Sequence, residues 1–206
     1  MPLSRRAMLG RTLIAAPLLS SDLFAPLLAA SQPQAPEEKW YWYPGHSLTF
    51  KSVGKDTGGT CTWILVENSP REGVPFHKHL HEDESFYVID GRFEITVADT
   101  TVVGGPGTYM YGPRAVQHRW TNVGSGRGRL LNVFTPSGLE DYFLAVAIPI
   151  VSSTQQPSVN MAKLNARMAP LREKFGLIRT GTTKYPRPGD PTVSNPAGDS
   201  KISIPK

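Results

Sequence analysis

Residues 76–91, FHKHLHEDESFYVIDG, carry His77 and His79 two positions apart and Glu84 five positions after the second histidine. Side chains alternate along a β-strand, so the two imidazoles point to the same side. After a short bend, the Glu84 carboxylate can return to the same place. Two neutral imidazoles and a carboxylate suit a divalent transition metal such as iron, manganese, nickel, copper or zinc. A fourth ligand follows later in the chain, at His118.

The segments around this stretch predict an all-β domain. Its end, residues 85–91, and the next segment, 92–99, have strand patterns, and Asp90-Gly91 between them predicts a hairpin turn. Glycine and proline number 19 each in 206 residues, above their average usage of roughly 7 and 5 per cent, which favours short strands and turns over long helices. The aromatic residues at 40–43 suit a strand or a lid across an opening, and further strand patterns cover 47–53, 60–69, 100–113, 116–124 and 126–136. Strands at this spacing indicate a β-sandwich or a barrel.

Residues 1–30 have the composition of a cleaved export signal: a basic start, an apolar middle, and small residues near Ala29-Ala30. Arg5-Arg6 resembles the twin-arginine signal of bacteria. A retained membrane anchor is the alternative, but the apolar run is interrupted by Pro17, Asp22 and Pro26. We expect a mature protein that begins near residue 31 or 32, is periplasmic or secreted, and has no membrane association after cleavage.

The rest of the chain divides into four parts. Residues 31–39 are a polar linker, 40–150 the barrel, 151–180 a C-terminal helical segment, and 181–206 an extended, Pro-rich tail. Ser137 is a plausible cap for a helix after the barrel, and Asn160 for the next one. The second helix has an apolar stripe typical of packing, which Pro170 would bend or split: Met161, Leu164, Met168 and Leu171.

The charge pattern argues against nucleic-acid binding. The net charge is +5, and the basic residues are scattered, as on a weakly basic solvated surface. The single cysteine, Cys61, permits no internal disulfide and suits a small buried position on a strand. No lysine or arginine clearly belongs to a cavity, which argues against phosphorylated substrates; Arg114 and Arg119 are the exceptions to watch.

Several residues near the histidine stretch compete for a place in the site. Asp83 is the alternative to Glu84, but its parity puts it on the face opposite to that of Phe86. Glu84 itself has two conceivable roles, metal ligand or catalytic general base. His81 is expected on the surface or behind the ligands. His46 could be an acid in the pocket, with the surface as the favoured alternative.

Continued alternation predicts a dry aromatic pocket around the metal, suited to a flat apolar substrate, although an ordinary barrel core would have the same pattern. The predicted lining consists of Phe86, Val88, Phe93, Tyr109 and Trp120. Tyr111 could take the place of Tyr109 in this lining.

Together, two stretches of the chain resemble the paired motifs of the cupin superfamily. The first motif matches at His77, His79, Glu84 and Gly91, and the second at Gly107, Pro113, Ala115, His118 and Asn122. The chain departs from the pattern twice. Arg71 stands where a glycine is usual, so that Gly73 would take over the turn, and Ala115 replaces another glycine.

Residues 45–150, with the helix at 161–178, look like small single-domain cupins of the quercetin-2,3-dioxygenase-like type. The resemblance implies a single jelly-roll barrel, or double-stranded β-helix, followed by a C-terminal helix and a flexible tail. It also implies a metal bound by His77, His79, Glu84 and His118, and a homodimer. It does not imply one activity, because this scaffold serves many chemistries.

These observations lead to a functional hypothesis: an exported, metal-dependent dioxygenase that acts on a small aromatic or enolic substrate resembling a flavonol. Two alternatives remain open. One is a non-catalytic cupin that binds a small molecule or a metal, and the other is an oxygen-independent isomerase or decarboxylase.

Overall fold

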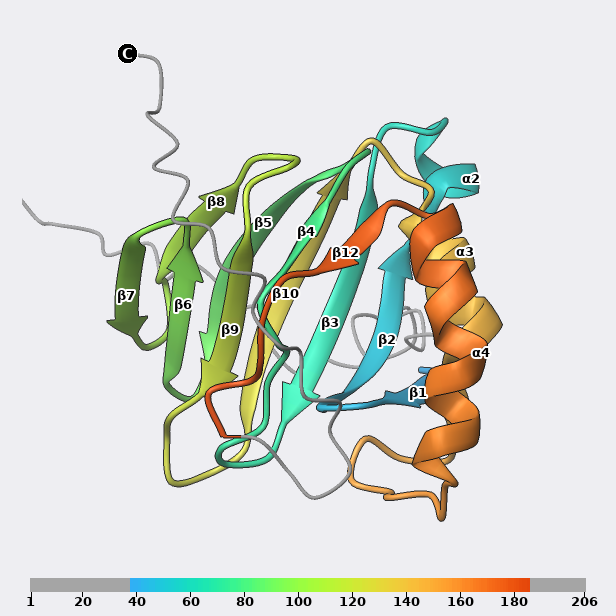
Figure 1. Cartoon of the computed structure of the whole chain (residues 1–206). Helices are drawn as coiled ribbons and strands as arrows, with labels where there is room; N and C mark the ends of the chain where they lie inside the picture. Colours follow the sequence, from blue (N-terminus) through green and yellow to red (C-terminus); the bar gives the residue numbers. More distant parts are fainter. Residues whose placement is uncertain (1–37, 186–206) are drawn as a thin grey trace, which may run out of the picture. The chain divides into compact units, whose positions relative to one another are not determined.

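The computed structural model describes residues 38–185, in which short strands form two antiparallel sheets (Figure 1). The first sheet has seven strands, in the order β11 (Ile148–Ile150), β1 (Trp40–Tyr43), β2 (His46–Ser52), β3 (Thr62–Asn68), β10 (Gly128–Thr135), β5 (Asp83–Asp90) and β8 (Tyr109–Gly112). The second has five, in the order β12 (Leu177–Arg179), β4 (His77–His79), β9 (His118–Asn122), β6 (Phe93–Val97) and β7 (Thr100–Gly104). The prediction of an all-β fold is confirmed.

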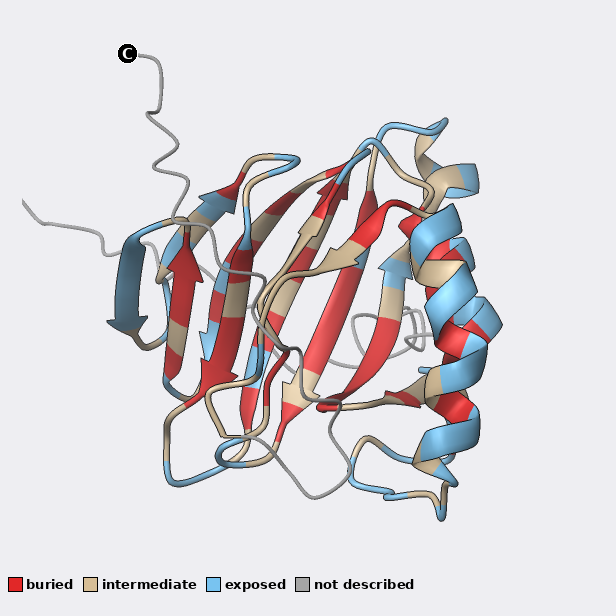
Figure 2. Cartoon of the chain, in the orientation of Figure 1, coloured by how far each residue is buried: buried red, intermediate tan, exposed pale blue. Residues whose placement is uncertain are grey.

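Alternating side chains build the core between the sheets (Figure 2). In β10 every second residue is buried, which puts Leu130, Asn132 and Phe134 on the inner face. The largest fully buried side chains include Trp120, Phe86 and Phe93. Burying one large apolar side chain contributes roughly 1.5–3 kcal/mol, so this face stabilises the sheets, and Asn132 is a polar exception that needs a partner.

The Asp90-Gly91 hairpin prediction is wrong. Strand β5 pairs with β10 and β8, whereas β6 pairs with β7 and β9, so the two strands lie in different sheets. Gly91 has φ 81°, and a Cβ there would lie 2.7 Å from the Gly128 Cα. The dipeptide therefore turns a corner between sheets, which needs the same positive φ as a hairpin turn.

Three helices complete the described part: α2 (Gly54–Thr57), α3 (Leu139–Val146) and α4 (Met161–Lys174). Gly138, rather than the expected Ser137, stands at the N-cap of α3. Asn160 caps α4 as predicted, because its side chain accepts a hydrogen bond from the Lys163 N–H at 3.0 Å. Pro170 lies inside α4, and the helix continues beyond it to Lys174.

Strand β12 was not anticipated, because it lies in the segment expected to be helical. It pairs with β4, the strand that carries the two neighbouring histidines, and α4 contacts both α3 and β12. The C-terminal segment thereby borders the histidine strand (Figure 1).

The predicted signal at 1–30, the linker up to residue 37 and the tail from residue 186 lie outside the described residues. Within 38–185, no helix has both the length and the apolar character that a membrane crossing requires.

Candidate metal centre

Three strands bring the four predicted ligands together. His77 and His79 lie on β4, Glu84 on β5 and His118 on β9, and His77 is the cross-strand partner of His118. One ligand atom from each residue lies within 4.8 Å of the others. His79, Glu84 and His118 are all at most 2% exposed. We call these four residues the His/Glu cluster; it is positioned to hold a metal ion.

The Glu84 carboxylate is at the centre of the His/Glu cluster. Its Oε2 lies 2.9 Å from Nε2 of His118, 3.1 Å from Nε2 of His79 and 3.8 Å from Nε2 of His77. Its Oε1 accepts a hydrogen bond from the Asn132 side chain at 2.5 Å. Burial raises the pKa of Glu84, but interactions with the three histidines outweigh burial, and its pKa lies well below the ordinary value. Glu84 is therefore an anion.

The other ring nitrogens define the protonation of two histidines. Nδ1 of His77 lies 2.8 Å from the Pro75 carbonyl oxygen, and Nδ1 of His118 lies 3.0 Å from that of Val116. Because a carbonyl oxygen only accepts, each Nδ1 carries a proton, and the Nε2 of each ring faces Glu84. Nε2 of His118 is buried and makes no hydrogen bond despite its short distance to the carboxylate.

This arrangement fits a metal ion. Burial lowers the pKa of His77, and it lowers that of His79 to about 4, so both rings are neutral near pH 7. A bound cation would take up lone pairs of these neutral rings and balance the negative charge of the buried carboxylate. Ligands at about 2.1 Å from one ion lie roughly 3.0–3.4 Å apart, close to the 2.9 and 3.1 Å that separate Glu84 Oε2 from Nε2 of His118 and of His79, whereas the 3.8 Å to His77 is longer. Neutral imidazoles and a carboxylate suit the transition metals named above.

Two buried polar residues next to the His/Glu cluster were not anticipated. Asn132 orients Glu84, and an amide on the apolar face of an alternating strand was the signal that could have identified it. Glu82 lies in the bend between β4 and β5, with its Oε2 3.9 Å from Nδ1 of His79. Burial raises the pKa of Glu82 to about 7. The bend has no periodicity, so no local pattern could have predicted this position.

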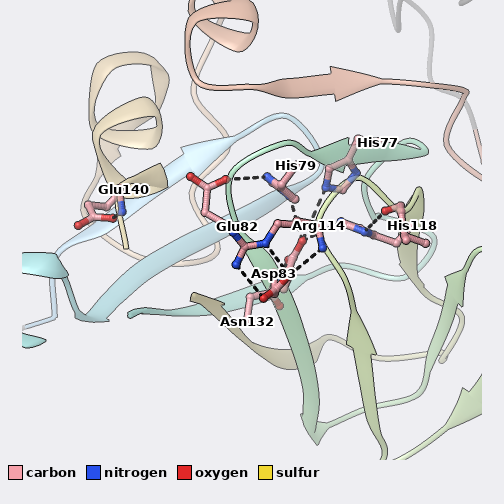
Figure 3. Close-up of polar contacts among 11 residues, drawn as sticks. His77, His79, Glu82, Asp83, Arg114, His118, Asn132 and Glu140 are labelled. Carbon is pink, nitrogen blue, oxygen red and sulfur yellow. Dashed lines mark hydrogen bonds and ion pairs between the residues drawn. The ribbon is translucent and has the colours of Figure 1, made fainter. Parts of the chain in front are cut away.

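The competing candidates lie outside the His/Glu cluster, and Figure 3 shows one of them, Asp83, with its partner Arg114. Asp83 faces away and forms an ion pair with Arg114 at 3.0 Å, so the cluster contains Glu84 and not Asp83. His81 is exposed. Arg119 pairs with Glu94. The expectation of a surface position for His46 is wrong, because it is 5% exposed and lines the cavity.

A cavity opens above the His/Glu cluster. His77, His79 and Glu84 line it, together with apolar and aromatic side chains that include Ile64, Val66, Val74, Trp120, Phe134 and Phe143. Cysteine 61 is partly buried and does not line it.

Of the five predicted pocket residues, only Trp120 lines this cavity. Phe86, Val88 and Phe93 are fully buried in the core. Tyr109 is 59% exposed, because its strand pairs Met110 with Phe86 on the inner face and therefore turns Tyr109 outward. Alternation predicts which side chains point inward, but not which of these border open space.

The expectation of a cavity without arginine is wrong. Helix α4 contributes Met161, Asn165, Met168 and Arg172 to the lining, and β12 contributes Leu177 and Arg179. These residues come from the C-terminal segment, whose place over the cavity depends on the pairing of β12 with β4.

Both departures from the motif pattern occupy a glycine-like backbone conformation. Arg71 has φ 67° and Ala115 has φ 64°. Gly73 does not take over the turn; a Cβ there would lie 2.2 Å from the Trp120 carbonyl oxygen, so its role is close contact with β9. The Ala115 N–H donates to the His79 carbonyl at 2.6 Å, which ties this loop to the metal-ligand strand.

Comparisons with known proteins gave one family match and several similar solved structures. Residues 64–134, which include the whole His/Glu cluster, match the family described as Cupin domain. No curated protein matches the chain. Similar solved structures include KdgF from Halomonas sp., at 18% identity and TM-score 0.47, covering 54% of this chain and 97% of that one. Another is a predicted oxalate decarboxylase from Thermotoga maritima, at 14% identity and TM-score 0.47, which covers 52% of this chain and 98% of its own.

At such low identities these structures say nothing about the activity of this chain. Residues 64–134 thus match the family described as Cupin domain, and the described residues form an all-β fold whose His/Glu cluster is positioned for a metal ion.

Proposed function

We propose that the protein is a metal-dependent dioxygenase that acts on a small aromatic or enolic substrate. The observation that carries this proposal is that three members of the His/Glu cluster, His77, His79 and Glu84, line a cavity with apolar and aromatic walls. A transition metal held there would supply coordination positions for a substrate oxygen and for dioxygen.

The protein's own groups have separate tasks in this proposal. The cavity walls, with Trp120 and Phe134, bind a flat ring and exclude water. Glu84 either remains a ligand or accepts the proton of a substrate hydroxyl as a general base. Asn132 holds Oε1 of Glu84 and so directs Oε2 toward the three imidazoles. When O₂ cleaves a carbon–carbon bond of such a substrate and both of its atoms enter the products, the substrate supplies all the electrons, so no external reductant is required.

Oxygen uptake by the metal-loaded protein with a flavonol tests the proposal. We expect uptake by the wild type, and we expect His79→Ala to lose bound metal and uptake together. The matched control is His81→Ala, which removes an exposed imidazole from the same stretch and should leave both unchanged. Full uptake by His79→Ala would contradict the mechanism.

Two further outcomes separate the alternatives. Turnover that persists without oxygen would indicate an isomerase or a decarboxylase. Tight binding of a flavonol and related enols that all remain unchanged would indicate a non-catalytic binding protein.

The proposal also includes export and dimerisation. Arg5-Arg6 before an apolar run supports export as a folded protein through a twin-arginine signal, and mass spectrometry of the periplasmic protein would locate the cleavage site. Exposed aromatic side chains on the paired strands β5 and β8 support a homodimer: Tyr87, Tyr109 and Tyr111. Sedimentation analysis of Tyr109→Ser against the wild type would test that interface.

A further inference from the structure

We propose that the cavity takes an anionic ligand, with Arg172 and Arg179 binding a carboxylate or another oxyanion at the wall formed by α4 and β12. This inference rests on the proposed function and narrows its substrate class from neutral aromatic compounds to phenolic or enolic acids.

Strand register places Arg179 beside the His/Glu cluster. In the pairing of β12 with β4, Arg179 is opposite His77 and Leu177 is opposite His79. Directly opposed residues project from the same face of a sheet, with Cβ atoms roughly 4.5–5.5 Å apart. All four of these residues line the cavity. The Arg179 side chain is held in part by its Nε, which donates to the Gly181 carbonyl oxygen at 3.3 Å.

Helix periodicity places Arg172 on the same wall. The residues of α4 that line the cavity, Met161, Asn165, Met168 and Arg172, are spaced by four, three and four positions, so they form one stripe. Arg172 is the last of them and is only partly buried. This cavity-lining stripe includes the packed side chains of Met161 and Met168, and it ends in the guanidinium group of Arg172.

The Tyr43 hydroxyl is within the electrostatic influence of both arginines. Burial raises the pKa of Tyr43, whereas its hydrogen bond to Tyr142 and the positive charges of Arg172 and Arg179 favour the ionised form. The two hydroxyl oxygens lie 2.9 Å apart. Tyr43, Arg172 and Arg179 all line the cavity.

The charge of the cavity favours an anion. Among the described residues that line it, the formally charged ones are Glu84, Arg172 and Arg179, and a divalent metal would add two positive charges. An oxyanion offsets such an excess of positive charge in partly apolar surroundings. The planar fork of a guanidinium also matches a carboxylate with two parallel hydrogen bonds. A neutral flavonol offers neither interaction.

Calorimetric titration with a matched pair of ligands tests this assignment. The pair is 3,4-dihydroxybenzoate and 3,4-dihydroxybenzamide, which share the catechol and differ in charge. We expect the wild type to bind the acid at least about tenfold more tightly than the amide, as for hydrogen bonds between charged groups. In Arg172→Gln/Arg179→Gln the two affinities should become equal, with that for the amide unchanged.

The control variant is Lys163→Gln/Lys174→Gln, which removes the same charge from exposed positions of α4 and should keep the preference for the acid. Thermal melting establishes that each variant is folded. A second titration, with inorganic phosphate, distinguishes the source of the oxyanion: tighter binding of phosphate than of the acid assigns the wall to phosphorylated ligands.

Equal affinities of the wild type for acid and amide, or a preference that survives in the double arginine variant, would overturn the inference. The measurement needs no turnover, so it is separable from the proposed activity. If the protein prefers the acid but takes up no oxygen, the proposed dioxygenase activity is contradicted and the anion site is supported. If it takes up oxygen with a neutral flavonol but shows no preference for the acid, the anion site is contradicted and the dioxygenase activity is supported.

Discussion

Two buried glutamates, Glu84 and Glu140, have the same side chain and opposite surroundings. They are 1% and 8% exposed. Around Glu140 all the neighbours donate: Gly54 N–H to Oε1 at 2.7 Å, and Gly138 N–H at 2.7 Å and the Thr62 hydroxyl at 2.5 Å to Oε2. Figure 3 shows Glu140 apart from the His/Glu cluster.

Around Glu84 imidazoles take the place of most of these donors. Asn132 donates to Oε1, Nε2 of His79 lies within hydrogen-bond distance of Oε2, and Nε2 of His77 and of His118 face the same oxygen. Glu140 is a structural acceptor that joins α2, β3 and the start of α3, whereas Glu84 lies among three imidazoles that can hold a metal ion together with it. Burial alone therefore does not separate a structural carboxylate from a metal ligand; the chemical type of the neighbours does.

Glu84→Gln should produce the largest effect on function. Losing the anionic ligand should lower the affinity for a divalent transition metal by at least about 100-fold, beyond the usual loss for residues behind the ligands. The stability of the metal-free protein should change little, because an amide can donate a hydrogen bond to an unprotonated imidazole. Metal analysis and urea unfolding measure the two quantities. Full metal content in Glu84→Gln would contradict the assignment of Glu84 as a metal ligand and with it the contrast to Glu140.

Glu140→Gln should show the reverse. An amide NH₂ would meet donors that the carboxylate now satisfies, and an unsatisfied buried group costs about 1–3 kcal/mol. We expect the free energy of unfolding to fall by about 2 kcal/mol, with the metal content per folded molecule unchanged. Urea unfolding and metal analysis of the same preparation test this, and a loss of metal without a loss of stability would contradict it.

The pH dependence of stability sharpens the role of Glu140. Burial raises its pKa, but the hydrogen bonds from Thr62, Gly54 and Gly138 outweigh burial and bring the pKa below the ordinary 4.5. A group with a lowered folded pKa stabilises fully above the unfolded pKa, and this contribution disappears as the pH falls from about 4.5 through the folded pKa. Below that pH, unfolding curves of the metal-free wild type should converge on those of Glu140→Gln. Parallel stability profiles of the two proteins would contradict this assignment.

A pair of backbone substitutions should have the smallest effects. The loop beside His79 has Ala115 at φ 64°, whereas the loop before Glu140 has Gly138 at φ 136°. A non-glycine residue in the left-handed region costs about 1–2 kcal/mol, partly offset by the larger entropy loss of glycine on folding. Ala115→Gly should therefore stabilise by about 0.5 kcal/mol, and Gly138→Ala should destabilise by about 1–2 kcal/mol. Thermal unfolding measures both, and a destabilised Ala115→Gly would show that its methyl group is needed.

Much of the candidate site could be predicted from local patterns. Period-two alternation brought His77 and His79 to one side and separated Glu84 from Asp83, because strand geometry makes neighbours diverge. The same rule contained the signal for Asn132. It could not distinguish Phe86, which is packed in the core, from Trp120, which borders the cavity, because both face inward.

The sequence by itself determined the short strands, the cap at Asn160 and the chemical type of the ligands, because each depends on a residue and its near neighbours. Only the tertiary structure decided that β5 and β6 enter different sheets, that β12 pairs with β4, and that Arg172 and Arg179 reach the cavity. Strand pairing joins residues about a hundred positions apart, and no local pattern specifies such a partner. The same pairing places Arg179 opposite His77, next to the predicted metal site.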